Sequence, residues 1–236
     1  MAFRKAERKN AKLRLAITGP SGSGKTYSAL LIALGIGGKI AMLDTENGSG
    51  ELYANLGDYD VETLTAPYDV RRYLQIIHEA EKAEYDVLII DSLSHAWAGE
   101  GGLLDLQSKV AAASKSGNSY TAWRQVTPLH NKLVEAILAS PCHIIATMRS
   151  KTEYLQTENE RGYKEIRKVG LAPVQREAMD YEFGTVFDLS ADHNATVSKD
   201  RTRLFDGQIF TITQDTGRPL LKWLENAPEE KQKGVA

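Results

Sequence analysis

The chain of 236 residues contains one cysteine, carries a formal net charge of −2, and has no apolar stretch long enough to cross a bilayer. One cysteine excludes an internal disulfide and a multi-cysteine metal site, and Cys142 in the apolar run CHIIATM is expected to be a small buried residue. Without a basic excess, nucleic acid can be bound only locally. The charged segment 1–14 lacks the apolar core of a secretory signal, so we expect a cytoplasmic protein with no membrane segment.

Short apolar runs alternate with longer amphipathic segments, which predicts an α/β fold with a mostly parallel central sheet flanked by helices. Strands are expected at residues 12–19, 39–44, 61–65, 85–91 and 143–148. Helices are expected at residues 26–35, 70–84, 102–114, 128–140 and 218–226. Residues 182–190 and 195–212 are expected to form antiparallel strands toward the C-terminus, with turns at DHN and DG. We expect one domain at residues 12–226, between a basic arm (1–11) and a disordered tail (227–236).

Polar residues mark the starts of two of these helices. Asp69 is expected to cap the helix that follows it, and Thr127 is expected to cap a helix whose first residue is Pro128. Residues 150–170 are polar, mixed in charge and without a clear period. They are predicted to form a long loop, and a loop of that length in a compact domain is usually functional.

The segment GPSGSGKT satisfies the pattern G-x-x-x-x-G-K-[ST] between a predicted strand and a predicted helix. Glycines let backbone N–H groups converge on phosphate oxygens, and the helix N-terminus adds the positive end of its dipole. Lys25 is expected to reach the β- and γ-phosphates of ATP, and Thr26 to supply an oxygen to Mg²⁺. The predicted nucleotide-binding residues are Gly19, Pro20, Ser21, Gly22, Ser23, Gly24, Lys25, Thr26 and Tyr27.

Two carboxylates follow other predicted strands. Asp91 ends the strand in LIIDS and is expected to hold Mg²⁺ through water, although a strand-end carboxylate can also simply cap the next segment. Glu46 in LDTENG would lie at the carboxyl edge of the sheet, where a carboxylate can orient and deprotonate the water that attacks the γ-phosphate. His95 in SLSHAW has no metal-ligand spacing around it and is expected to be structural.

The order GPSGSGKT, LDTE, LIIDS and IIATMR resembles the RecA-type ATPase core. The resemblance implies that Glu46 is the catalytic base and that the residue ending the later strand senses the γ-phosphate and couples it to a DNA-binding loop. That family usually has glutamine at the sensor position. This chain has Met148-Arg149 there, and Arg149 is the better candidate.

Longer segments resemble bacteriophage-encoded RecA-like ATPases of the single-strand annealing and recombination group. These are DSLSHAWAGEGGLLD, residues 122–154 and SKDRT, and the resemblance extends over roughly residues 12–225. It implies DNA-stimulated ATP hydrolysis, binding of single-stranded DNA and self-association into a filament or ring, with a single-strand-binding protein as a further candidate partner.

Two short patterns suggest contacts between subunits. Lys199 and Arg201 alternate on a predicted strand, and the resemblance implies that such a pair completes the ATP site of a neighbouring subunit; a solvated charged strand is the alternative. In FRKA, Phe3 and Ala6 fit the F-x-x-A segment through which Rad-type recombinases polymerise, and a frayed basic tail is the alternative.

DNA is expected to contact the segment after the sensor strand. Its basic residues would follow the phosphate backbone, and its tyrosines would stack bases; the alternative is an ordinary mixed-charge surface loop. The predicted DNA-binding residues are Lys151, Arg161, Lys164, Arg167 and Lys168. An earlier segment, SKSGNSYTAWR, offers Lys115, Tyr120, Trp123 and Arg124 as a second DNA loop, unless Trp123 belongs to the core.

Two other functions remain open at the level of sequence. A small-molecule or nucleotide kinase would need an acceptor pocket with several arginines. A nucleotide-gated adaptor, such as a helicase-loading partner, would bind ATP without appreciable turnover.

Overall fold

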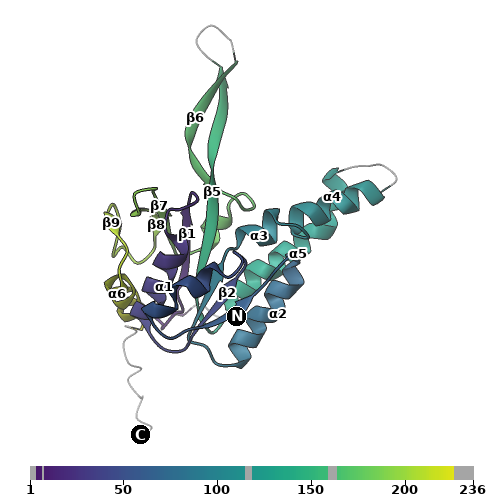
Figure 1. The fold of residues 1–236 in the computed structure, drawn as a ribbon. Coiled ribbons are helices and arrows are strands. Elements are labelled where there is room, and N and C mark those ends of the chain that lie inside the picture. Colours follow the sequence, from purple (N-terminus) through teal and green to yellow (C-terminus); the bar gives the residue numbers. More distant parts are fainter. Residues whose placement is uncertain (1–3, 7, 115–118, 159–163, 226–236) are drawn as a thin grey trace.

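The computed structural model describes residues 4–6, 8–114, 119–158 and 164–225, with residues 152–158 and 164–171 described through their backbone alone. Among these residues, a nine-stranded sheet has the order β3-β2-β4-β5-β1-β7-β8-β9, and β6 pairs with β5 (Figure 1). The strands are β1 (Arg14–Gly19), β2 (Ile40–Asp44), β3 (Asp60–Thr63), β4 (Val87–Asp91), β5 (His143–Glu158), β6 (Lys164–Pro173), β7 (Thr185–Leu189), β8 (Asn194–Asp200) and β9 (Ile209–Thr211).

The sheet is parallel from β3 to β7 and antiparallel from β7 to β9. The predicted fold class, a mostly parallel α/β sheet with antiparallel strands toward the C-terminus, is therefore confirmed. Because all six parallel strands run the same way, their carboxyl ends meet at one edge of the sheet, where ligands bind in folds of this kind.

Helices cover both faces of the sheet. They are α1 (Lys25–Ile36), α2 (Val70–Lys82), α3 (Ser94–Ala98), α4 (Leu103–Ala113), α5 (Ser119–Ala139) and α6 (Gln214–Glu225), with 3₁₀ turns η1 (Ser49–Leu56) and η2 (Met179–Glu182). Successive strand residues point to opposite faces: Ile89 packs in the core layer of α1 and α6, whereas Leu88 and Ile90 pack in that of α2 and α5. Strands buried on both faces explain the continuous apolar runs.

The predicted start of one helix is wrong. Thr127 and Pro128 were expected at an N-terminus, but α5 runs from Ser119 to Ala139 with Pro128 inside it. An interior proline costs about 3 kcal/mol, and burying one large aliphatic side chain returns about 1.5–3 kcal/mol. The buried face of α5 continues at helical spacing through the proline, so packing outweighs the lost hydrogen bond; its residues are Ala122, Val126, His130, Leu133 and Ile137.

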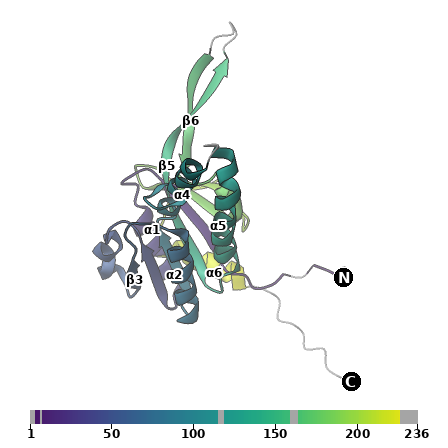
Figure 2. The ribbon, with the colours of Figure 1, turned by 90° about the vertical axis from the view of Figure 1, so that its right-hand side faces the viewer.

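The predicted long loop at residues 150–170 is also wrong, because this segment forms a hairpin. Beyond Arg149, β5 leaves the parallel sheet and pairs with β6 in antiparallel register, from Ser150 opposite Pro173 to Glu158 opposite Lys164. Figures 1 and 2 show the two strands projecting from the body of the protein. Apolar alternation marks a strand that packs one face on a core layer, and strands that project beyond the helices that cover the sheet do not require it.

Other predictions concern the ends of the chain and single residues. Asp69 caps α2 by accepting a hydrogen bond from the Arg71 N–H, and Cys142 is buried, as expected. Arg8 of the N-terminal arm lies over the ring of Trp223 in α6, at 4.4 Å from its centre. Phe3 and the predicted tail at 227–236 lie outside the described residues. In the described part of the chain, every helix is too short or too polar to span a membrane.

Candidate nucleotide site

The phosphate loop joins β1 to α1 in a conformation that suits anion binding. Gly22 and Gly24 have φ values of 77° and 85°, which lie in the left-handed region that glycine adopts without strain. Helix α1 begins at Lys25, its N-cap Gly24 provides no side-chain cap, and its first turn holds no acidic residue. The N–H groups of this turn and the positive end of the helix dipole are therefore available to a phosphate.

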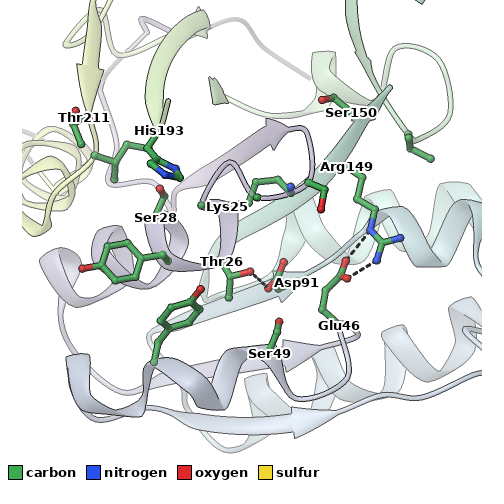
Figure 3. Close-up of a pocket in the computed structure, with 17 residues that line it drawn as sticks. Lys25, Thr26, Ser28, Glu46, Ser49, Asp91, Arg149, Ser150, His193 and Thr211 are labelled. Atoms are coloured by element: carbon green, nitrogen blue, oxygen red, sulfur yellow. Dashed lines mark hydrogen bonds and ion pairs between the residues drawn. The ribbon is translucent and has the colours of Figure 1, made fainter. Parts of the chain in front are cut away.

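The loop borders a cavity of about 990 Å³ at the carboxyl edge of the sheet (Figure 3). Two serine hydroxyls that line it, those of Ser49 and Ser150, are buried and have no hydrogen-bond partner among the described residues. Buried polar atoms are normally satisfied, so a ligand rich in oxygen fits this cavity. The predicted loop residues Ser21, Gly22, Gly24, Lys25, Thr26 and Tyr27 all line it.

Lys25 extends along the phosphate loop, and its Nζ donates a hydrogen bond of 2.8 Å to the carbonyl oxygen of Pro20. Burial lowers the pKa of the Lys25 ammonium, and the carboxylates of Asp91 and Glu46 offset this only in part. An ammonium that is short of solvent gains strongly from an anionic partner. Phosphate oxygens in the cavity would supply that partner.

Thr26 and Asp91 lie together at the base of the cavity, where the Thr26 hydroxyl donates a hydrogen bond of 2.6 Å to Asp91 Oδ2. The other carboxylate oxygen of Asp91 accepts from Thr147. Burial raises the pKa of Asp91 despite these two hydrogen bonds, so a nearby cation would stabilise its ionised form. One hydroxyl, one carboxylate and the phosphates of the nucleotide form an all-oxygen donor set of the kind that Mg²⁺ takes.

Glu46 forms a two-pronged ion pair with Arg149, whose Nε donates to Glu46 Oε1 at 2.9 Å and whose Nη2 donates to Oε2. Ser92 also donates to Glu46 Oε1, at 3.1 Å. Burial of the Glu46 carboxyl raises its pKa, but the Arg149 guanidinium outweighs this, and the pKa lies below its ordinary value. Both residues line the nucleotide cavity (Figure 3), so the structure brings the predicted base and the predicted sensor together.

The backbone around Glu46 is fixed by a residue that sequence reasoning missed. Asp44, at the end of β2, is fully buried; its Oδ1 accepts from the Glu46 N–H at 2.6 Å and its Oδ2 from the Gly50 N–H at 3.0 Å. The available signal was an aspartate that ends a buried strand, with the turn pair Asn47-Gly48 three residues further on. His95 has a structural contact, as expected: its Nδ1 lies 2.7 Å from the Thr45 hydroxyl, and its ring stacks on Tyr68.

Aromatic residues and a histidine also line the cavity. Tyr27 and Tyr53 pack edge to face with ring centres 5.4 Å apart, and both line the cavity. His193, in the turn between β7 and β8, lies against the phosphate loop with its Nδ1 3.1 Å from the Ser23 carbonyl oxygen. Of these residues, sequence reasoning found only Tyr27, because Tyr53 and His193 reach the cavity from distant parts of the chain.

Lys199 and Arg201 are not among the described residues that line this cavity. Lys199, on β8, donates to the carbonyl oxygens of Asp180 and Tyr181 at 3.3 and 2.6 Å. The pKa of Lys199 is lowered, mainly by burial and to a smaller extent by the positive charge of Arg201. The predicted alternation on one strand is wrong for Arg201, because β8 ends at Asp200 and Arg201 lies exposed in the turn that follows.

Four of the five predicted DNA-binding residues lie on the strands of the projecting hairpin, and none of the four lines the nucleotide cavity. Lys151 is exposed on β5. On the β6 backbone, Lys164, Arg167 and Lys168 lie opposite residues 158, 155 and 154 of β5. Arg161, like Lys115 of the second predicted DNA loop, lies outside the described residues.

A family model described as "AAA domain" matches residues 11–218 of the chain. Among solved structures, the crystal structure of the RadB recombinase is similar, with a TM-score of 0.45 and 18% sequence identity over 87% of this chain and 90% of that chain. No curated protein matches the chain.

Proposed function

The chain belongs to the AAA domain family and is a P-loop NTPase, and on that premise we propose that it is a RecA-like recombination ATPase that binds single-stranded DNA. It hydrolyses Mg-ATP at the interfaces between its own subunits, assembled as a filament or ring, and hydrolysis is stimulated by DNA. The resemblance to bacteriophage-encoded proteins of the annealing and recombination group supports this proposal. We propose a single-strand-binding protein as a further partner.

One observation carries the proposal: the ion pair between Glu46 and Arg149 in the nucleotide cavity. Arg149 is the residue at which β5 leaves the parallel sheet and enters the hairpin that bears the predicted DNA-binding residues. A ligand that displaces the hairpin therefore acts on a side chain that holds the candidate catalytic base. This contact supports coupling between DNA and hydrolysis.

The residues of the cavity have different roles in hydrolysis. The N–H groups of the phosphate loop and Lys25 bind the β- and γ-phosphates and stabilise the negative charge that develops on them. Thr26 and Asp91 would hold Mg²⁺, which supplies further charge neutralisation at the phosphate oxygens. Glu46 orients the attacking water and accepts its proton. Lys199 and Arg201 of a neighbouring subunit add positive charge in the transition state.

In the paired state Glu46 is a weak base, because both of its oxygens bind Arg149 and its pKa is lowered. Movement of Arg149 toward the γ-phosphate would free Glu46 and raise its pKa toward the ordinary value, which makes it a better proton acceptor. We infer that single-stranded DNA on the hairpin favours that movement. Turnover is then low without DNA and high with it.

The alternative functions make different demands on this cavity. A kinase acceptor pocket needs several arginines, whereas Arg149 is the one arginine among the described lining residues. The ion pair of Glu46 fits a nucleotide-gated adaptor better than it fits a kinase. A protein whose catalytic base is held permanently by an arginine would bind ATP without hydrolysing it. Measured turnover separates the adaptor from the ATPase.

Replacing Arg149 with glutamine is expected to abolish DNA stimulation. Without the guanidinium, Glu46 is no longer held, so hydrolysis in the absence of DNA does not fall, and the ratio of rates with and without single-stranded DNA approaches one. Coupling of this kind is typically worth about 5- to 150-fold, so the loss is measurable by steady-state phosphate release. The matched control is Arg71→Gln, which breaks an exposed ion pair with Asp69 on α2 and should keep the wild-type ratio. An Arg149→Gln protein that is stimulated as strongly as the wild type would rule out this coupling route.

A further inference from the structure

We propose that a second surface stacks the bases of single-stranded DNA. This surface, the α5 groove, is a cavity of about 1170 Å³ whose principal lining residues are Trp97, Tyr120, Trp123, Arg124, Pro128 and Arg176. It shares none of its described lining residues with the nucleotide cavity. The inference rests on the proposed function, which requires bound DNA, and it assigns the place where the bases are held.

Aromatic rings line the groove. Trp97 of α3 and Trp123 of α5 stack on each other with ring centres 5.5 Å apart and planes at 19°, and both are half-buried against the core. Tyr120, one helical turn before Trp123, is 81% exposed. Aromatic rings beside a concavity are the platforms on which single-stranded nucleic acid stacks its bases, with little dependence on sequence.

Positive charge lies beside these rings. Arg124 is exposed, and the Arg176 guanidinium carbon lies 5.9 Å from the centre of the Trp123 ring. Acidic residues lie on one side of the groove: Glu177 lines both the groove and an adjoining cavity, and Glu135 and Glu182 line the adjoining cavity. We therefore expect the phosphates near Arg124 and away from the adjoining cavity. Stacked rings flanked by arginine match a ligand that is both anionic and flat, as a nucleic-acid strand is.

One buried polar atom lies beside the groove. His130 lines the adjoining cavity, is 7% exposed, and has no hydrogen-bond partner for its Nδ1 among the described residues. A buried polar atom is costly when it is unpaired. A polar group on the edge of a base that reaches this cavity could satisfy it.

A short segment after β6 connects the groove to the nucleotide cavity. Val174 lines the nucleotide cavity, and its N–H donates a hydrogen bond of 2.6 Å to the Arg149 carbonyl oxygen. Gln175 is buried and donates from its side chain to the Leu93 carbonyl at 3.0 Å. Arg176 then enters the groove. DNA bound in the groove would thus contact a segment that is hydrogen-bonded to Arg149.

Tryptophan fluorescence tests the proposal directly. The parent protein for the test carries Trp223→Phe, which removes the tryptophan on α6 and leaves Trp97 and Trp123 as reporters. In the presence of a slowly hydrolysed ATP analogue, the parent protein is titrated separately with an oligodeoxythymidine and with an abasic strand of the same length. We expect the oligodeoxythymidine to quench the fluorescence and the abasic strand to bind more weakly without quenching. Tyr120→Ala and Trp123→Leu should each weaken binding by about 5- to 100-fold, whereas Arg218→Ala on α6 should bind as the parent does.

The outcomes separate this inference from the proposed function. Failure of the parent to bind any single strand contradicts the proposed function itself. Binding without quenching, together with unchanged affinity in Tyr120→Ala, overturns the groove assignment alone and leaves the groove to a protein partner. Equal affinity for the abasic strand overturns base stacking. Thermal unfolding checks the fold of Trp123→Leu; Tyr120 is 81% exposed, so its alanine variant tests the groove even if Trp123→Leu does not fold.

Discussion

Replacing Glu46 with glutamine is expected to lower ATP turnover by about 10²- to 10⁴-fold, which is the usual contribution of a positioned general base. Glutamine has nearly the same shape and can still accept from Ser92, but it cannot take the proton of the attacking water. Lys25 and the phosphate loop are untouched, so nucleotide affinity should change little. Single-turnover hydrolysis and equilibrium binding of a fluorescent ATP analogue measure the two quantities separately.

The matched control is Glu62→Gln, an exposed carboxylate on the edge strand β3, which should keep wild-type turnover. If Glu46→Gln hydrolyses ATP at the wild-type rate, Glu46 is not the base. If it loses nucleotide binding together with turnover, the carboxylate is needed to maintain the site and its role as base has no support.

Replacing Arg201 with alanine is expected to lower the rate of the assembled protein by up to about 10³- to 10⁵-fold, the range of an arginine finger supplied by a neighbour. Lys199→Ala should have a smaller effect, because Lys199 also binds two carbonyl oxygens within its own chain. The reason for both losses is that positive charge from the next subunit is missing in the transition state.

Mixing two inactive variants distinguishes a neighbour's residue from one that acts within its own chain. In an assembly of Arg201→Ala and Glu46→Gln subunits in equal amounts, about one interface in four pairs an intact Glu46 with an intact Arg201, as expected for head-to-tail contacts. The mixture should recover about that share of wild-type turnover. Arg203→Ala, an exposed arginine in the same turn, is the control. If the mixture stays as inactive as its components, Arg201 does not act on a neighbour.

The parts of this site that sequence could predict are local ones. The spacing of Gly19, Gly24, Lys25 and Thr26 predicts a phosphate loop, and outside the site Asp69 caps α2 by accepting a hydrogen bond from the Arg71 N–H two residues later. Such features depend on residues close together in the chain. The carboxylates Glu46 and Asp91 were predictable for a related reason, because each follows a buried strand and parallel strands end at one edge.

Features that depend on distant residues were missed. The bidentate pairing of Arg149 with Glu46 joins residues far apart in sequence and follows from sheet order, which single-sequence patterns do not reveal. The α5 start was misplaced because Pro128 gave a strong local signal that tertiary packing overrides. For the hairpin, the five residues between Glu158 and Lys164 include Gly162, and β-branched residues flank them, which was a usable signal.

We propose that this ATPase shares its site between subunits and is switched by single-stranded DNA. The decisive measurement is steady-state ATP hydrolysis with and without single-stranded DNA over a range of protein concentrations. We expect strong stimulation by DNA and a turnover per subunit that rises with concentration until assembly is complete. A turnover that is indifferent to both DNA and concentration would contradict it and would favour a kinase that acts as a monomer.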